Sequence, residues 1–190
     1  MSDTLSTQNR LSSSMPIQPR SPASVASDTE QFLRFHLLPD TTALLSVRQL
    51  TEVLHIPIGQ IVPIPHTPAW VMGVYNWRGE ILWMVDIGHL VGLTPWYQQI
   101  TGVSNYTAIV LHTRSSSHNS TQVKSHILGL VVNRIEDMEW CNPDGIQSPP
   151  SAPVTPELAP FLRGYWVKSS GEMLAVLDGT AITEAMPKIQ

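Results

Sequence analysis

The chain has 190 residues, of which 42% are hydrophobic, and its 11 Lys and Arg against 15 Asp and Glu give a formal net charge of −4. This length and composition predict a globular protein of one domain or two small lobes, and 16 Pro with 11 Gly favour many turns over long helices. The acidic balance and the lack of a Lys/Arg cluster argue against nucleic acid as a partner, because no phosphate-neutralising surface is available.

The cysteine content and the hydropathy of the chain indicate where in the cell the protein is expected. Cys141 is the one cysteine, so neither an internal disulfide nor a cysteine zinc site can form within one chain. The N-terminus lacks an apolar segment of signal-peptide length, and no window comes near the roughly 20 apolar residues that span a bilayer. We therefore expect a soluble, cytoplasmic protein that does not insert into the membrane.

Predicted elements in the first half begin after a polar tail. Residues 1–30 include 17 Ser, Thr, Pro, Gln or Asn, which predicts a disordered tail. Order is expected from Phe32, where "FLRFHLL", the turn-like "PDTT" and "ALLSV" indicate a hairpin. The next segment, "VRQLTEVLHI", places apolar residues at helical spacing and predicts a helix of about two turns before Pro57.

The middle of the chain predicts an extended segment, a hairpin and a helical turn. Three prolines in "QIVPIPHTP" favour extended backbone. Two apolar strands then flank a turn at Arg78 and Gly79, and Gly79 is expected to supply a positive φ. In "DIGHLVGL", Asp86 is predicted to cap a brief helix that Gly92 ends.

The second half repeats this pattern. "YTAIVLH" predicts a strand, residues 113–125 an exposed polar loop, and "ILGLVV" another strand. Six prolines make residues 143–160 irregular, and "GYWVKSSGEMLAVLD" predicts a last hairpin before a closing helix begun by Asp178. Strands, a glycine-containing hairpin and a short helix thus occur twice, which predicts an all-β protein of two small barrels or sheets.

The motifs give little support to catalysis or to a cofactor. Asp86 and His89 are three residues apart and could form a small enzyme site, but a helix cap followed by a histidine explains them equally well, and no nucleophile accompanies them. The histidines lack metal-ligand spacing, and neither GxGxxG nor GxxxxGK[ST] occurs. We expect no metal and no cofactor.

Arg78 is the informative position. It could be a solvated turn residue, or it could extend five N–H donors beside Trp77 toward an acidic or carbonyl-rich partner. Spacing alone leaves both readings open.

The sequence around the Arg78–Gly79 turn resembles that of a known protein family. "TPAWVMGVYNWRGEILWMVDI" resembles the signature of the CheW-like domain of bacterial chemosensory arrays, and "FLRFHL", "ILGLVVNRIEDMEW" and "PFLRGYWVKSSGEMLAVLD" resemble other family strands. The resemblance covers residues 31–186. It implies two five-stranded SH3-like β-barrels and a non-catalytic adaptor that couples methyl-accepting chemoreceptors, at their helical tips, to the regulatory domain of a CheA-type histidine kinase. The output could equally be swimming, phototaxis or type IV pilus motility, or the module could have diverged to another protein partner.

The resemblance also implies partner-binding residues. Asn76, Arg78 and Gly79 match the family's N-x-R-G turn, in which Trp77 replaces the usual Leu. Leu50 and Glu52 match the receptor-side helix. The other matches and departures are Gly129, which falls on the strand glycine of the second subdomain, Trp83, where proline is common, and Asn133, where Asp is usual.

Overall fold

The computed structural model describes residues 29–98, 104–116, 123–148 and 155–187. Most of the predicted tail, up to residue 28, lies outside the described residues. Strand β1 begins at Glu30, which pairs with Cys141 across the sheet.

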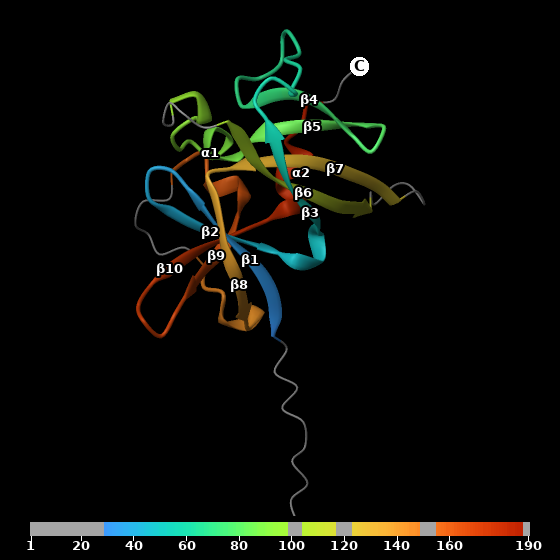
Figure 1. Ribbon diagram of the computed structural model, residues 1–190. Helices are drawn as coiled ribbons and strands as arrows, with labels where there is room; N and C mark the ends of the chain where they lie inside the picture. Colours follow the sequence, from blue (N-terminus) through green and yellow to red (C-terminus); the bar gives the residue numbers. More distant parts are fainter. Residues whose placement is uncertain (1–28, 99–103, 117–122, 149–154, 188–190) are drawn as a thin grey trace, which may run out of the picture.

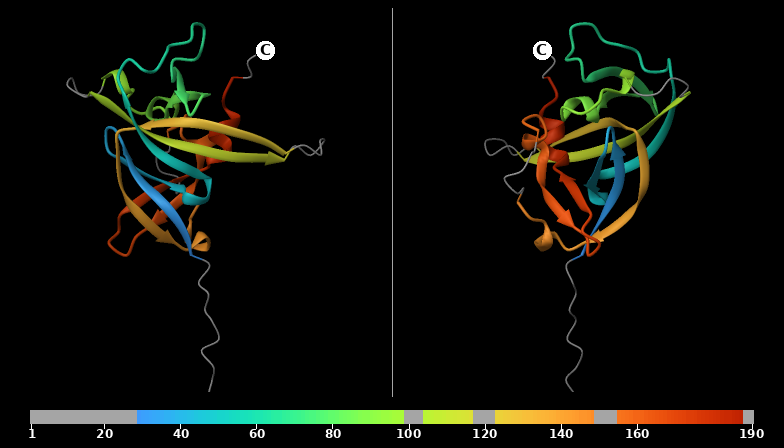
Figure 2. Two further views of the ribbon diagram at one scale, coloured as in Figure 1. Left: turned by 45° about the vertical axis from the view of Figure 1, so that its right-hand side comes forward. Right: turned by 90° about the vertical axis from the view of Figure 1, so that its left-hand side faces the viewer.

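Ten strands form two five-stranded sheets within the described residues (Figure 1). The first sheet has the order β8-β1-β2-β10-β9 and comprises β1 (Glu30–Leu37), β2 (Thr41–Ser46), β8 (Arg134–Cys141), β9 (Leu162–Val167) and β10 (Met173–Leu177). The second has the order β3-β6-β7-β5-β4 and comprises β3 (Leu50–Pro57), β4 (Val71–Trp77), β5 (Glu80–Asp86), β6 (Asn105–Ser116) and β7 (Val123–Val132). Both sheets curl strongly, so the predicted all-β fold of two five-stranded barrels is confirmed (Figure 2).

Short helical segments connect the strands. They are α1 (Ile87–Leu90), α2 (Gly179–Glu184) and the 3₁₀ turns η1 (Val47–Gln49), η2 (Trp96–Gln98), η3 (Pro143–Gly145) and η4 (Ala159–Phe161). Among the helices of the described residues, none combines the length and the apolar composition that crossing a bilayer requires.

The two barrels share one plan, as the repeated sequence pattern predicted. Each contains one parallel strand pair, β5–β7 or β2–β10, and each contains a hairpin, β4–β5 or β9–β10, that is followed by a short helix. Asp86 caps α1 by accepting the backbone N–H of His89, and Asp178 caps α2 by accepting two backbone N–H groups, as expected of N-cap aspartates.

A glycine in the first strand of each of these hairpins permits a close backbone contact. Val62 and Val74 exchange backbone hydrogen bonds of 2.8 and 2.9 Å, and a Cβ on the neighbouring Gly73 would lie 2.1 Å from the Val62 carbonyl oxygen. In the other barrel, Gln147 and Tyr165 exchange equivalent hydrogen bonds beside Gly164. These contacts hold the preceding loop against the first strand of each hairpin.

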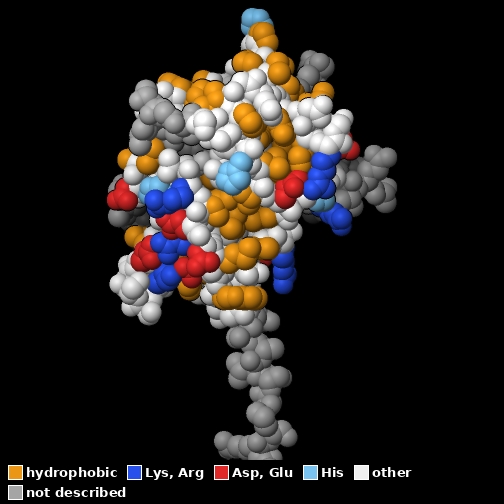
Figure 3. Space-filling model, viewed as in Figure 1, with side chains coloured by type: hydrophobic (Ala, Val, Ile, Leu, Met, Phe, Trp, Pro, Cys, Tyr) orange, Lys and Arg blue, Asp and Glu red, His pale blue; other side chains and the backbone are white. Residues whose placement is uncertain are grey.

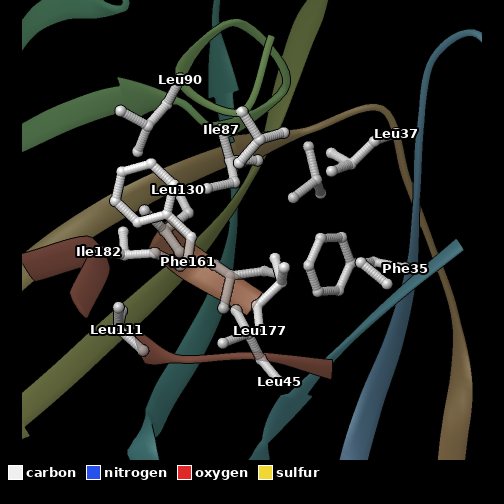
Figure 4. Close-up of a cluster of buried hydrophobic side chains, with 14 of the residues drawn as sticks. Phe35, Leu37, Leu45, Ile87, Leu90, Leu111, Leu130, Phe161, Leu177 and Ile182 are labelled. Carbon is white, nitrogen blue, oxygen red and sulfur yellow. The ribbon is translucent and has the colours of Figure 1, made fainter. Parts of the chain in front are cut away.

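Three apolar clusters stabilise the molecule. One fills the barrel of strands β3 to β7, which we call the β3–β7 barrel, and has the buried members Ile56, Ile61, Leu82, Met84, Ala108, Val110 and Val131. A second fills the other barrel, which we call the β8–β9 barrel after the two end strands of its sheet, and has the buried members Phe32, Leu44, Cys141, Leu174 and Val176. The third is the largest and joins residues from both barrels, including Phe35, Leu45, Ile87, Leu130 and Phe161 (Figure 4). Because apolar burial drives folding, this shared cluster makes the two barrels one packed unit.

Two local predictions are wrong. Residues 47–54 do not form a two-turn helix, because η1 is followed at once by strand β3, which pairs with β6. The predicted loop at 113–125 is shorter than expected, because β6 continues to Ser116 and β7 starts at Val123. Residues 117–122 lie outside the described residues.

Candidate functional site

The Asn76–Gly79 turn joins β4 to β5 in two central residues. Trp77 pairs with Glu80 across the hairpin, and the Asn76 side chain accepts the Gly79 backbone N–H at 3.0 Å. Gly79 has φ +86°, as predicted, and Arg78 also has a positive φ of +54°. Two successive positive φ values match the twist of a two-residue hairpin, but this geometry favours Asn, Asp or Gly over arginine.

Three side chains close into what we call the Glu52 cluster, formed by Glu52, Trp77 and Arg78. One Glu52 oxygen accepts the indole N–H of Trp77, and the other accepts Nη2 of Arg78 at 3.0 Å. The Arg78 guanidinium lies 5.1 Å from the Trp77 ring centroid, within cation–π range. Glu52 is partly buried, whereas 67% of the Arg78 side chain stays exposed. The cluster therefore orients the arginine and leaves most of its donors to solvent.

The cluster lies where the β3–β7 barrel closes. β3 and β4 are the two ends of the strand order, so the contacts of Glu52 link a β3 side chain to the β4–β5 hairpin. Apolar side chains are exposed on the same strands: Ile81, which pairs with Asn76, is 74% exposed, and Val53 is also exposed. An arginine and a tryptophan beside exposed aliphatic residues form a composition typical of protein interfaces.

The other predicted site residues have separate positions. Leu50 and Glu52 lie on strand β3, so their assignment to a helix is wrong. Leu50 is partly buried and packs against the cluster shared by the two barrels. Gly129 is buried on β7, where a Cβ would lie 2.5 Å from the sulfur of Met84, so its lack of a side chain lets β5 and β7 pack closely. The structure thus brings Glu52 to the turn and leaves Leu50 and Gly129 apart from it.

The Asp86 side chain caps α1 and contacts the backbone of His89. The two Asp86 oxygens accept the backbone N–H groups of His89 at 3.1 Å and Trp96 at 2.8 Å. Burial raises the pKa of the Asp86 carboxyl above its usual value, although these N–H donors and the nearby His89 act in the opposite direction. The Asp86 carboxylate is therefore occupied in joining α1 to the Trp96 turn. Within the described part of the chain, no group of three or more His, Cys, Asp or Glu could hold a metal ion.

The β8–β9 barrel closes through a larger ionic network that the sequence did not predict. Arg34 on β1 contacts Glu136 and Glu139 on β8 and Glu172 beside the β9–β10 turn. Lys168, which follows β9, also contacts Glu139 on β8. Figure 3 shows positive and negative side chains gathered on the β9–β10 side of the molecule, next to exposed hydrophobic side chains. Strand pairing between β1 and β8 brings these charges together across more than half of the chain, so no local motif signals them.

Comparison with known proteins identifies the family. The model of the CheW-like domain matches residues 31–186. The chain belongs to the CheW-like domain family. It is 29% identical over 116 residues to the chemotaxis protein CheW of Rhizobium meliloti (strain 1021), covering 61% of this chain and 64% of that protein. It is 28% identical over 87 residues to the probable chemotaxis protein CheW of Rhizobium etli, covering 46% and 47%. The chain thus spans less than two thirds of either relative.

A solved CheW-like structure supports the fold. The crystal structure of the scaffolding protein TtCheW from Thermoanaerobacter tengcongensis superposes with a TM-score of 0.60 and 21% identity, covering 79% of this chain and 89% of that chain. At this identity the likeness concerns the fold, and it agrees with the two SH3-like barrels implied by the sequence resemblance.

Proposed function

We propose that this protein is a non-catalytic adaptor of a chemosensory array, which couples methyl-accepting chemoreceptors to a CheA-type histidine kinase in the cytoplasm. Membership of the CheW-like family and relatives named as chemotaxis and scaffolding proteins support this role. The observation that carries the site assignment is Arg78, which is exposed, oriented by Glu52 and held at a positive φ.

Conformational energies favour a contact function for Arg78. A non-glycine residue in the left-handed region costs about 1–2 kcal/mol. An exposed ion pair returns about 0–1 kcal/mol, and an exposed cation–π contact about 0.5–1 kcal/mol. Stability alone therefore gives arginine no clear advantage over Asn or Gly at this position. An arginine that contacts a partner through its free donors accounts for a residue that the local backbone disfavours.

The surface around the Glu52 cluster indicates the kind of partner. Arg78 supplies charge-assisted hydrogen bonds to carboxylates or backbone carbonyls, and Ile81 with the Trp77 ring supplies apolar contact area. We assign this surface to the kinase regulatory domain or the receptor tip. We also retain Leu50 and Gly129 as proposed contributors, Leu50 at a receptor-side contact and Gly129 by keeping β5 and β7 close.

Capture from the native cells tests the assignment. The tagged full-length protein, its Arg78→Glu variant and an Arg134→Glu control should be compared by mass spectrometry. Arg134 is a matched control, because it is 63% exposed and forms an ion pair with Glu136 at 2.7 Å in the other barrel. We expect the kinase and receptor with the wild type and with Arg134→Glu, and a reduced yield of at least one with Arg78→Glu. Equal capture by all three proteins would refute the site, and absence of both partners from the wild-type sample would refute the function.

A charge swap separates a partner contact from an internal role. In the double variant Glu52→Arg/Arg78→Glu, the ion pair is restored with reversed polarity. If Arg78 contacts a partner, this variant should fold normally and still bind poorly. Recovered binding would show that the internal pair, and not the exposed arginine, is what the partner requires. The receptor captured with the wild type would also distinguish swimming, phototaxis and pilus motility as outputs.

A further inference from the structure

A second polar surface lies on the β8–β9 barrel, away from the Glu52 cluster. A depression of about 380 Å³ is lined by Glu30, Phe32, Ser46, Arg48, Gln49, Arg163, Leu177 and Asp178. This volume is within the range of ligand-binding pockets in proteins. The lining residues come from β1, the end of β2, η1, β9, the end of β10 and the N-cap of α2, so the depression is formed by the folded barrel and not by one loop.

Two arginines in this depression converge on one carboxylate without hydrogen bonding to it. Nε of Arg48 lies 4.0 Å and Nη1 of Arg163 lies 3.9 Å from the two oxygens of Glu30. Both distances exceed the 2.7–3.2 Å of an N–H···O hydrogen bond. Glu30 also accepts the Ser46 hydroxyl. Glu30 therefore lies within 4.0 Å of both guanidinium groups but accepts a hydrogen bond from neither.

The same surface continues to an exposed aromatic side chain. A neighbouring depression of about 260 Å³ shares Glu30 and Arg48 and is also lined by Trp140, which is exposed. Arg48 is 83% exposed between the two depressions. Arginine and tryptophan are among the residues enriched at binding hot spots. A small molecule would occupy one depression, whereas a protein segment could occupy both.

We infer that the Arg48–Arg163 depression binds a carboxylate side chain from an acidic segment of a partner protein, with Trp140 packing against an adjacent apolar residue of that segment. Glu30 holds the two arginines near each other in the unbound protein and competes with the incoming carboxylate. A carboxylate fits better than a phosphate group, because Glu30 and Asp178 line the same depression and would repel a dianion more strongly. This inference does not depend on the proposed chemosensory function.

Fluorescence anisotropy with the full-length protein tests the inference. The probe is a labelled helical peptide with glutamates along one face, and its control carries glutamine at the same positions. Arg48→Ala and Arg163→Ala should each weaken binding of the glutamate peptide by about five- to tenfold, since each removes charge-assisted hydrogen bonds. Glu30→Gln should tighten binding by about threefold, because it removes the internal competitor. Arg114→Ala, at an exposed arginine on β6, is the matched control and should leave binding unchanged.

Three outcomes would overturn the inference. Equal binding of the glutamate and glutamine peptides would show that the depression does not recognise a carboxylate. If Arg114→Ala weakens binding as much as Arg48→Ala and Arg163→Ala do, the effect comes from overall charge and not from this depression. The third concerns Asp3 and Asp28, the two acidic residues before residue 29. If the full-length Asp3→Asn/Asp28→Asn variant gains as much affinity as Glu30→Gln, the arginines bind the protein's own N-terminal segment and not a partner.

Discussion

Replacement of Gly73 by alanine should be among the most damaging small changes in this protein. The added Cβ would lie 2.1 Å from the carbonyl oxygen of Val62 and 2.9 Å from Cα of Pro63, and both are backbone atoms. The loop must then move away, which breaks the two Val62–Val74 hydrogen bonds, each contributing about 1 kcal/mol. The φ of +136° adds about 1–3 kcal/mol of strain for a residue with a side chain. We expect a loss of about 3–5 kcal/mol.

Urea unfolding of the wild type, Gly73→Ala and Gly79→Ala measures this loss. Gly79 is the control: it has φ +86°, but a Cβ there would meet nothing within 4 Å, so it isolates the conformational cost of about 1 kcal/mol. The same clash exists at Gly164, where a Cβ would lie 2.5 Å from the Gln147 carbonyl oxygen, so Gly164→Ala should resemble Gly73→Ala. If Gly73→Ala is no less stable than Gly79→Ala, close backbone contact does not hold the loop in place.

Three further predictions concern charge and the thiol in the β8–β9 barrel. Arg34→Met should cost about 2 kcal/mol in urea unfolding, because it leaves three glutamates at the barrel edge without their shared partner, and a change below about 0.5 kcal/mol would contradict the network. Hydrogen bonds from Arg134 and Arg34 lower the pKa of Glu136, so its stabilising effect is present above the usual glutamate pKa and is lost as the pH falls. Glu136→Gln should therefore lose less stability than the wild type between about pH 5 and pH 3, and identical slopes would refute this. Burial raises the pKa of Cys141 to about 11, so Ellman's reagent at about pH 8 should react with this thiol after unfolding and not in the native protein; rapid native reaction would show that it is accessible.

The sequence predicted correctly the elements that depend on contacts between neighbouring residues. The Arg78–Gly79 hairpin, the Asp86 and Asp178 caps and the repeated barrel plan follow from turn and capping chemistry, which acts over a few residues. The family resemblance correctly indicated two five-stranded barrels.

Strand β3 shows why one prediction failed. Leu50, Leu54 and Ile56 face inward at period two, but the fourth inward position is Glu52 and the outward face includes Val53. A charged residue on the inner face and an apolar residue on the outer face conceal the strand alternation and leave an apparent helical spacing. The two irregular residues are also the ones that contribute to the proposed contact surface. If the proposed contact is correct, local patterns fail here because these residues serve partner binding and not packing.

The order of strands along the chain has a consequence for how the protein folds. Strands β3 to β7 are consecutive and form one barrel, whereas the other barrel combines β1 and β2 with β8, β9 and β10. Arg34 and Glu136 are 102 residues apart, so pairing β1 with β8 must close a long loop. If the β3–β7 barrel forms first, it brings the start of β3 close to the end of β7, and the loop that remains between β1 and β8 becomes effectively shorter. Pulse-labelling hydrogen exchange should then find β6 and β7 protected before β1 and β8, and simultaneous protection would mean that the two barrels form in a single step.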